Sequence, residues 1–386
     1  MGRRFVAFSG LDDAIVLYPV YALLFADTGL STSEISSLFV IWSAGALLLE
    51  VPLGALADRV SRRKLLAVAA VVRAVGFGLW VFFPSYWAFA LGFVLWSVKG
   101  ALTSGTLEAL VYDELAAVGQ TSFYTRLLGR SSAAENVGSI VAAAAAIPLM
   151  ASGSYLLVGL VSMAVCLLQI PVVLSFPETP RVEEVGEEGG IRGYLSTLRS
   201  GVGEAVHSPV LRRLVLIAGV VPGLLAFDEY FPLLGREYGI ATADIVWLNL
   251  VPTLAMIAAA LIVARWQPVL IPVLLTTALI VGGALWGSVP GVVAVGLGIG
   301  TYHLVQLVLE SQVQHAIQGR ARATVTGVVG LLAELSAIAV FAWFALGANW
   351  LTTALLFLVN GVAILPLGIY ATKVMRATRR TDGQSG

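Results

Sequence analysis

The main pattern along the chain is a series of long apolar runs separated by short polar breaks. Each run has about 20 mainly apolar residues, the length that a helix needs to cross a bilayer. The breaks carry turn or charge signals, such as Asp27-Thr28-Gly29 and Pro84-Ser85. The pattern predicts twelve membrane-spanning helices, over residues 5–26, 36–57, 65–83, 87–110, 127–150, 155–176, 211–234, 245–264, 269–288, 291–313, 323–346 and 351–372.

Composition favours lipid as the surroundings of these helices. Hydrophobic residues make up 58% of the chain and charged residues 12%, with a mean hydropathy of +0.90. Soluble proteins average about 45–50% apolar and about 25% charged residues. The first run contains Asp12 and Asp13 and lacks a small-residue cleavage pattern, so we expect a retained helix rather than a secretory signal. The single cysteine, Cys166, excludes an internal disulfide.

The basic residues predict the topology. Of the 23 lysines and arginines, all but Arg73, Lys99 and Arg236 fall on the predicted cytoplasmic side, in the tails, the linker, the even-numbered loops or the span ends next to them. Cytoplasmic loops of membrane proteins carry the excess of lysine and arginine. We therefore expect a multi-pass protein of the plasma membrane with both termini in the cytoplasm. Six tryptophans near the ends of predicted spans are typical of interfacial anchors: Trp42, Trp80, Trp87, Trp247, Trp286 and Trp350.

One long polar segment divides the chain. It opens with Pro177-Glu178-Thr179-Pro180, and its later part repeats apolar residues at helical spacing, from Ile191 to Val206. A helix with such a stripe lies in the membrane interface. We therefore predict an N-terminal six-helix bundle over 1–176, a cytoplasmic linker with an interfacial helix over 177–208, and a C-terminal six-helix bundle over 209–386.

The two halves resemble each other. Residues 29–35 read Gly-Leu-Ser-Thr-Ser-Glu-Ile, and residues 239–245 read Gly-Ile-Ala-Thr-Ala-Asp-Ile. Leu107-Glu108 in the fourth helix is echoed by Leu309-Glu310 in the tenth. The constant order of these matches indicates duplication of a six-helix unit. Parallel repeats of this kind place a substrate site at their interface, near the bilayer midplane.

A loop motif names a family. Residues 54–64, between the second and third helices, read Gly-Ala-Leu-Ala-Asp-Arg-Val-Ser-Arg-Arg-Lys. This resembles the G-x-L-A-D-R-x-G-R-K signature of the major facilitator superfamily, with serine at position 61 where glycine is usual. The resemblance covers the whole chain and implies an all-α fold of twelve helices in two pseudo-symmetric bundles. It also implies rocker-switch alternating access, with a gating motif formed by Gly54, Asp58, Arg59, Arg62 and Arg63.

Asp58 has a physical role to play in such a gate. A carboxylate at the end of a helix can face the positive N-terminus of a neighbouring helix, and the resemblance implies that this neighbour is the eleventh helix, near Arg322. The alternative for Arg62, Arg63 and Lys64 is that they only set topology. The segments 49–52 and 104–113 look like a bacterial drug-efflux branch, but the fifth helix lacks the Gly-Pro pair common in antiporters.

Ionisable residues inside the spans are candidates for function, because each costs about 2.5–3.5 kcal/mol on insertion scales. Carboxylates outnumber the two cations, Arg73 and Lys99. An acidic interior favours cationic or zwitterionic substrates, and buried carboxylates can carry protons. The carboxylates in predicted spans are Asp12, Asp13, Glu50, Glu108, Glu135, Asp228, Glu229, Glu310 and Glu334.

The family resemblance implies which of these face the cavity, because helices one, four, seven and ten line it and two, five, eight and eleven lie beside it. It favours one of Asp12 and Asp13, together with Glu135 and Glu334, as proton-coupling residues. Adjacent helical residues point about 100° apart, so we expect only one aspartate to face the cavity. Candidates for the substrate cavity are Lys99, Glu108, Asp228, His303, Gln306 and Glu310.

Alternatives remain open for several of these. Lys99 pairs with a carboxylate of the first or fifth helix, or contacts an anionic substrate group. Glu108 has a structural role or a cavity role, Asp228 forms part of an outer gate or is simply hydrated, and His303 relays protons or only makes a hydrogen bond.

The sequence therefore predicts a proton-coupled secondary transporter, with export of a small amphiphilic or cationic compound as the leading direction. An importer or a lipid transporter on the same fold is the alternative, and a non-transporting scaffold or receptor is the rival class. No phosphate-binding glycine loop, metal-ligand spacing or nucleophile motif is present. We expect no enzyme activity, no cofactor beyond the proton gradient, no metal, no nucleic-acid partner, contacts with lipid, and a functional monomer.

Overall fold

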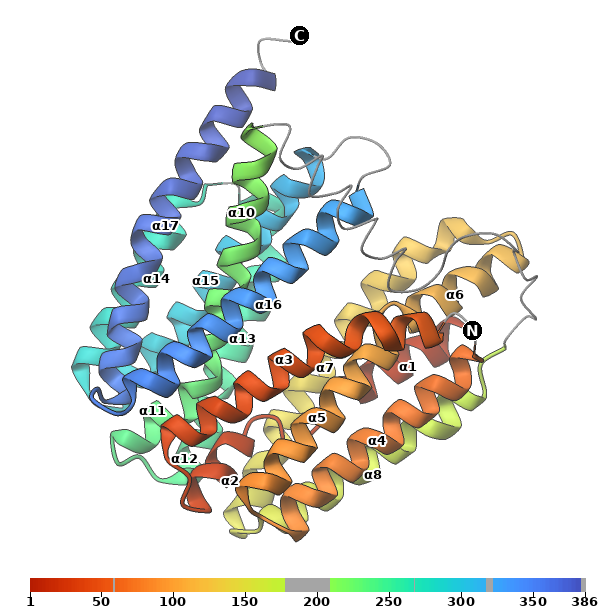
Figure 1. Ribbon diagram of the computed structural model, residues 1–386, viewed down its shortest axis with the longest axis horizontal. Coiled ribbons are helices and arrows are strands. Elements are labelled where there is room, and N and C mark those ends of the chain that lie inside the picture. Colours follow the sequence, from red (N-terminus) through yellow and green to blue (C-terminus); the bar gives the residue numbers. More distant parts are fainter. Residues whose placement is uncertain (58–59, 178–208, 267, 317–321, 383–386) are drawn as a thin grey trace. The chain divides into compact units, whose positions relative to one another are not determined.

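The computed structural model describes residues 1–57, 60–177, 209–266, 268–316 and 322–382, and these residues form helices and no strand (Figure 1). Among them, ten helical stretches are long and apolar enough to cross a membrane. One further apolar helix, α14 (Leu270–Trp286), is shorter. The first predicted span consists of two short helices, and with it the count is consistent with twelve spans. The predicted all-α membrane fold is confirmed.

Contacts within the chain divide it into two compact units. The first contains Met1–Leu30 and Leu38–Tyr194, and the second contains Ser31–Ser37 and Leu195–Gly386. The predicted bundle boundaries stay a prediction, because residues 178–208 of the linker lie outside the described part of the chain.

Helices of the first unit pack along one another in a bundle (Figure 1). α4 lies against α5 and α8, and α1 lies against α7 and α8. The elements up to the linker are α1 (Gly2–Asp13), α2 (Tyr21–Asp27), α3 (Thr32–Ala57), α4 (Arg62–Phe82), α5 (Tyr86–Thr103), α6 (Thr106–Ala117), η1 (Thr121–Phe123), α7 (Tyr124–Ala151) and α8 (Tyr155–Leu174).

The second unit repeats this arrangement. α10 lies against α15, α16 and α17, and α14 lies against α15 and α17. Its elements are α10 (Pro209–Leu224), η2 (Leu225–Tyr230), α11 (Phe231–Glu237), α12 (Thr242–Leu248), α13 (Leu250–Ile262), η3 (Val263–Arg265), α14, α15 (Val289–Ala316), α16 (Arg322–Gly347) and α17 (Thr353–Asp382).

Four predicted spans are interrupted, which corrects the expectation of continuous helices. Span 5–26 breaks between α1 and α2, where Pro19 lacks the N–H that a continuing helix needs. Span 87–110 breaks at Gly105, whose φ of 67° lies in the left-handed region, and its second part continues to Ala117 as α6. Span 211–234 narrows to the 3₁₀ segment η2 just before Pro232, and span 245–264 is interrupted at Asn249.

The internal repeat is visible in the backbone. α2 covers residues 21–27 and α11 covers residues 231–237, so both have seven residues at an offset of 210. Gly29 (φ 95°) and Gly239 (φ 71°) follow at the same offset, and both use a conformation that favours glycine. The next helices begin at Thr32 and Thr242. This is the offset at which the two sequences match.

Each half also ends its first membrane segment in a carboxylate that binds the start of its own sixth helix. The Tyr155 hydroxyl, on the first residue of α8, donates to Asp27 Oδ2 at 2.5 Å. At the equivalent position, Glu237 accepts hydrogen bonds from the backbone N–H groups of Thr353 (2.6 Å) and Ala354 (3.2 Å) at the start of α17. These two contacts, called here the carboxylate latches, hold the short segments α2 and α11 in place.

Removing the second latch should loosen α17 locally. In Glu237→Ala the first N–H groups of α17 lose their acceptor, and loss of such a cap typically costs about 0.5–2 kcal/mol. We expect the free energy of local opening of the first turn of α17 to fall by roughly that amount, so that hydrogen–deuterium exchange there becomes faster. Exchange in α8 should stay unchanged. Asp244→Ala, which removes an exposed carboxylate from α12, is the control, and an equal effect there would contradict the latch.

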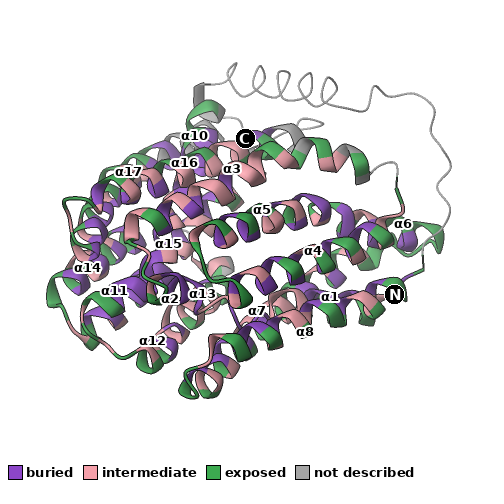
Figure 2. Cartoon of the chain, turned by 60° about the horizontal axis from the view of Figure 1, so that its bottom comes forward, coloured by how far each residue is buried: buried purple, intermediate pink, exposed green. Residues whose placement is uncertain are grey.

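The outer faces of the helices suit lipid. Figure 2 shows that α4 has both exposed and buried residues along its length. Val68, Val71 and Val75 are exposed and recur every three to four residues, whereas Arg73 on the other face is buried. Such an apolar stripe pointing away from the bundle is expected where hydrocarbon is the solvent.

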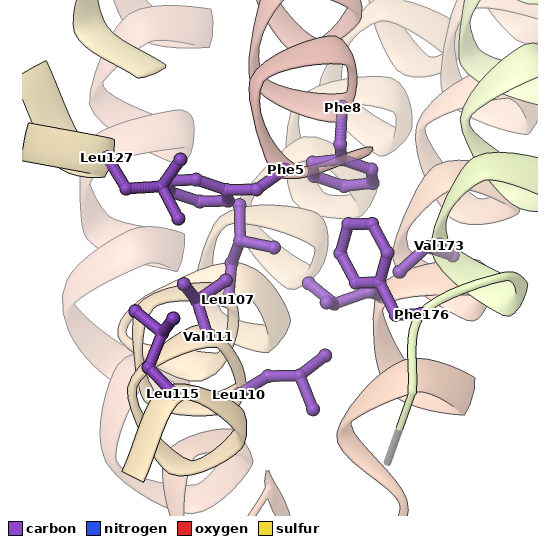
Figure 3. Close-up of a cluster of buried hydrophobic side chains, with 10 residues drawn as sticks. Phe5, Phe8, Leu107, Leu110, Val111, Leu115, Leu127, Val173 and Phe176 are labelled. Atoms are coloured by element: carbon purple, nitrogen blue, oxygen red, sulfur yellow. The ribbon is translucent and has the colours of Figure 1, made fainter. Parts of the chain in front are cut away.

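Inside the first unit, an apolar cluster joins the N-terminal end of α1 to α6 and α8 (Figure 3). Phe8 and Phe176 meet with ring centroids 6.3 Å apart. The buried members are Phe5, Phe8, Leu66, Leu107, Leu110, Val111, Leu115, Leu127, Val173 and Phe176. They fix the N-terminal end of α1, whose C-terminal end carries Asp12 and Asp13.

Candidate functional site: a charge network at the break of the first helix

The first unit holds a network of charged side chains where α1 ends. Asp12 and Asp13 are the last two residues of α1, and α2 begins only at Tyr21. Proline at position 19 and the absence of a continuous backbone ladder leave peptide groups without helical partners. Because lipid offers no hydrogen bonds, such groups must find partners inside the protein.

Asp12 binds two cations at once. Arg73 Nη2 of α4 lies 2.8 Å from Asp12 Oδ1, and Lys99 Nζ of α5 lies 2.7 Å from Asp12 Oδ2. The Arg73 side chain is fully buried, and that of Asp12 is 26% exposed. Of the two predicted alternatives for Lys99, the structure has the ion pair with a carboxylate of the first helix. Removing one partner from a buried pair leaves an uncompensated charge, a strongly destabilising change.

Arg73 also holds the two sides of the break together. Its Nη1 donates to the backbone carbonyl of Asp12 at 3.1 Å and to the hydroxyl of Tyr18, also at 3.1 Å. One guanidinium therefore binds the last residue of α1 through both backbone and side chain, and also a residue of the connecting segment. The rigid fork of arginine suits this combination of acceptors.

α8 supplies partners for the remaining peptide groups. Gln169 Nε2 donates to the carbonyl of Leu11 at 3.2 Å, and the N–H of Leu17 donates to Ser162 Oγ at 3.0 Å. Ser162 and Gln169 are seven residues apart on an otherwise apolar helix, and so lie on one face. Neighbouring helices thus supply side-chain partners for the carbonyls of Leu11 and Asp12 and for the N–H of Leu17, which tie the break to α4 and α8.

Glu135 lies beside this network on α7. The Ser131 hydroxyl donates to Glu135 Oε1 at 3.1 Å and lies 2.6 Å from the hydroxyl of Ser9 on α1. Asp13 interacts electrostatically with Asp12 and Glu135. Three carboxylates therefore share two cations, both of which are engaged with Asp12. Addition of one proton would make the group neutral.

The close approach of α7 to α1 depends on a glycine. A Cβ at Gly138 would lie 2.3 Å from the carbonyl oxygen of Gly10 and 3.1 Å from the nitrogen of Ala14. Both are backbone atoms, which cannot move away without shifting a helix. Small residues at such contacts let membrane helices approach closely, and here they bring Glu135 up to the end of α1.

The loop motif is described in part. Asp58 and Arg59 lie outside the described residues, and a Cβ on Gly54 would meet no atom within 4 Å. Arg62 forms an ion pair with Asp113 of α6. Arg63 Nη1 donates to the carbonyls of Phe176 (3.1 Å) and Leu174 (3.4 Å) at the end of α8, where cations are favourable. The gating role of the motif stays a prediction.

The other predicted residues lie apart from the Asp12 network or in the second unit. Glu108 is exposed on the first turn of α6 and interacts electrostatically with Tyr124. In the second unit, Asp228 lies in η2 beside Glu229, and His303 Nδ1 lies 3.4 Å from Gln306 Oε1 on α15. Glu310 is exposed on α15, and Glu334 is half-buried on α16. In the part of the chain that the structure describes, no group of three metal-ligating residues occurs.

Sequence reasoning missed three members of the network: Arg73 as a site residue, and Ser162 and Gln169 altogether. Each carried a signal. Arg73 is an arginine in the middle of an apolar span, and Ser162 and Gln169 form a polar stripe at helical spacing. The prediction that Trp80 is an interfacial anchor was wrong, whereas that for the partly exposed Trp42 stays a prediction. Trp80 is fully buried, donates from Nε1 to the carbonyl of Phe89 at 3.1 Å, and packs among other aromatic rings, as does Trp42.

A sequence model described as Major Facilitator Superfamily matches residues 5–342 of the chain. The chain belongs to this superfamily. No curated protein matches the sequence closely enough to count as a relative. A break in the first helix is compatible with a membrane-spanning fold of this kind. The backbone groups that leave the helical pattern are buried in protein, where side chains from neighbouring helices bind them.

Several transporters of known structure have the same fold as this chain. The nucleoside transporter NupG has a TM-score of 0.70 at 13% identity, covering 96% of this chain and 97% of that one. A bacterial homologue of the human lysosomal transporter Spinster, inward-facing and unoccupied, has a TM-score of 0.64 at 14% identity and covers 97% and 94%. A D-xylose-proton symporter also scores 0.64, at 16% identity and 95% coverage of each chain. Membership of the superfamily indicates a multi-pass membrane transporter, and these structures show that the chain has the same fold.

Proposed function

We propose that this protein is a proton-coupled secondary transporter that exports a small amphiphilic or cationic compound by rocker-switch alternating access. It would work as a monomer in the plasma membrane, in contact with lipid, with both termini in the cytoplasm. The proton gradient would supply the energy, and no bound cofactor would be needed. Asp58 and the arginines of the loop motif would form its cytoplasmic gate.

One observation supports proton coupling above the others: the carboxylates around the first-helix break exceed their cations by one. Asp12 forms ion pairs with both Arg73 and Lys99. Asp13 and Glu135 therefore interact with each other without a cation of their own. Two like charges held close in a membrane protein repel each other, and a proton or a cationic substrate relieves that repulsion. Competition between the two for the same carboxylates is the simplest basis for exchange.

Proton-coupled uptake is the second candidate. The fold likeness to a D-xylose-proton symporter and to a nucleoside transporter supports it, and so does the absence of a Gly-Pro pair in the fifth helix. The two candidates differ in the direction of proton flow relative to substrate. Symport moves both inward, whereas export exchanges them.

Proton movement in proteoliposomes that contain a pH-sensitive dye tests the proposal. Lipophilic cations, nucleosides and sugars would be added in turn to vesicles carrying the wild-type protein. We expect a cationic compound to drive proton flux, and we expect Asp13→Asn and Glu135→Gln each to lower that flux at least about tenfold, the loss expected when a proton-transfer group is removed. Asp58→Asn tests the gate in the same assay.

The control is Asp244→Asn, which neutralises an exposed carboxylate on α12. It should leave proton flux unchanged. Substrate exchange without any proton movement would overturn coupling, and flux driven by a sugar or nucleoside in the inward direction would favour uptake. Unchanged flux in both Asp13→Asn and Glu135→Gln would remove these residues from the coupling step.

A further inference from the structure

Three aromatic side chains stand together at the break of the first helix. Tyr18 stacks on Trp96 of α5 with ring centroids 4.9 Å apart and an interplanar angle of 4°. Trp42 of α3 lies against the same indole at 4.9 Å and 36°. All three side chains are partly exposed. We call Tyr18, Trp42 and Trp96 the aromatic wall.

The aromatic wall is held rigidly by buried rings behind it. Phe77, Trp80 and Phe93 are at most 1% exposed, and each lies within 6.0 Å of the Trp96 ring centroid. Trp42 is stacked on Phe93 at 5.6 Å. Rings fixed in this way lose little conformational entropy when a ligand binds, and preorganisation of this kind is a main source of affinity.

The wall adjoins the charge network through two of its members. The Tyr18 hydroxyl accepts a hydrogen bond from Arg73, and Lys99 lies one turn beyond Trp96 on α5. Tyr18 interacts electrostatically with both Asp12 and Asp13. The charged surroundings and the 26% exposure of the Asp12 side chain indicate contact with water rather than with lipid tails, which do not accommodate a carboxylate.

Asp13, like Glu135, is a carboxylate beside Asp12 that forms no ion pair among the described residues. Its side chain is partly exposed, and among the described residues it forms neither a hydrogen bond nor an ion pair. Both nearby cations are bound to Asp12 instead. A partly exposed carboxylate that interacts electrostatically with Tyr18 of the aromatic wall matches, together with the rings, the two halves of one ligand type: a flat ring that carries a positive charge. The ring can stack on the wall and the charge can meet both the carboxylate and the negative faces of the indoles.

We propose that the aromatic wall and Asp13 together bind a planar aromatic cation. The site itself does not depend on coupling, although its use in export rests on the proposed function. The wall supplies stacking that tolerates different ring systems, and Asp13 supplies selection for positive charge. A neutral planar ring could stack on the aromatic wall but would not pair with Asp13. A cation without a ring could pair with Asp13 but would not stack.

The test is equilibrium dialysis of the full-length protein in lipid nanodiscs, with empty nanodiscs as the blank. Three probes separate the two requirements: N-methylacridinium, neutral acridine at pH 8, and tetrabutylammonium. We expect N-methylacridinium to bind on the order of tenfold more tightly than either of the others. Trp42→Leu should weaken binding of both acridines, and Trp42→Phe should restore most of it. Asp13→Asn should lower the affinity for N-methylacridinium toward that for acridine without changing the affinity for acridine itself.

The matched control is Trp350→Leu, because Trp350 is 80% exposed and lies in the second unit. It should bind all probes as the wild type does, and a melting curve for every variant checks that it is folded. Equal binding of the three probes, or no effect of Trp42→Leu in a folded protein, would overturn the site. If the wild type binds with the expected selectivity but moves no protons, the coupling proposal fails and the binding site stands.

Discussion

Replacing Arg73 with leucine is expected to destabilise the protein by about 3–5 kcal/mol and to abolish transport. The guanidinium is fully buried and binds the carboxylate and the carbonyl of Asp12 as well as the Tyr18 hydroxyl. Leucine offers none of these hydrogen bonds. It would leave the last carbonyl of α1 and one carboxylate oxygen without partners where water is scarce, so the break of the first helix would lose its main support.

Two further substitutions separate charge from geometry. Arg73→Lys keeps the charge but has no fork to reach three acceptors, so its melting temperature in detergent should fall between those of Arg73→Leu and the wild type. Arg130→Leu removes an exposed arginine. Its free energy of unfolding should differ from that of the wild type by no more than about 0.5 kcal/mol, so its melting temperature should be close to that of the wild type. A melting temperature for Arg73→Leu equal to that of Arg130→Leu would contradict the structural role of the network.

The second large effect is expected from Gly138→Ala. A single added methyl group would clash with the backbone of Gly10 and Ala14, so α7 must move away from α1. Overpacking of this kind typically costs about 1–3 kcal/mol. Because Ser131 and Glu135 lie one to two turns earlier on α7, the shift would also carry both away from α1 and break the contact between the Ser131 and Ser9 hydroxyls. We expect a lower melting temperature together with slower substrate-driven proton flux.

The same helix offers a matched control for that substitution. A Cβ at Gly129 would meet no atom within 4 Å, so Gly129→Ala should gain roughly 0.5–1 kcal/mol from the better helix propensity of alanine. Opposite signs for two glycine-to-alanine changes on one helix are hard to explain without the contact at Gly138. Equal melting temperatures for both variants would argue against it.

The regular spans could be predicted from hydrophobicity because their length is set by the bilayer. Residues 65–83 were expected and α4 covers Arg62–Phe82; residues 155–176 were expected and α8 covers Tyr155–Leu174. The offset of 210 between the halves also appears in both sequence and backbone, because tight turns at Gly29 and Gly239 require glycine.

The broken spans could not be predicted in the same way. The residues on both sides of a break are equally apolar, so hydrophobicity does not reveal it. The side chains that stabilise the break lie far away in the sequence. The Leu17 N–H is satisfied by a serine 145 residues away, and the Leu11 carbonyl by a glutamine 158 residues away. Pro19 was visible, but a proline in a membrane helix can also leave it kinked and continuous.

The candidate site shows a similar limit. An intramembrane charge costs free energy without a partner, so the sequence could indicate that Lys99 has one, but not whether it is on the first or fifth helix. Arg73 was counted only as an opposing charge, since its contacts to the backbone depend on where α1 ends. The roles of Glu334 and Asp58 stay predictions.

The order in which the chain is made adds a consequence to the network around Asp12. Asp12 and Asp13 are synthesised first, Arg73 and Lys99 follow, and Gln169 comes last. At a ribosomal rate of about 5–20 residues per second, the interval from Asp12 to Gln169 lasts on the order of ten seconds. Asp12 has neither of its cations until Arg73 and Lys99 have been made, and the Leu11 carbonyl lacks its partner until the end of the interval. The insertion machinery must therefore shelter this segment, which gains its last hydrogen-bond partner only when the sixth span has arrived.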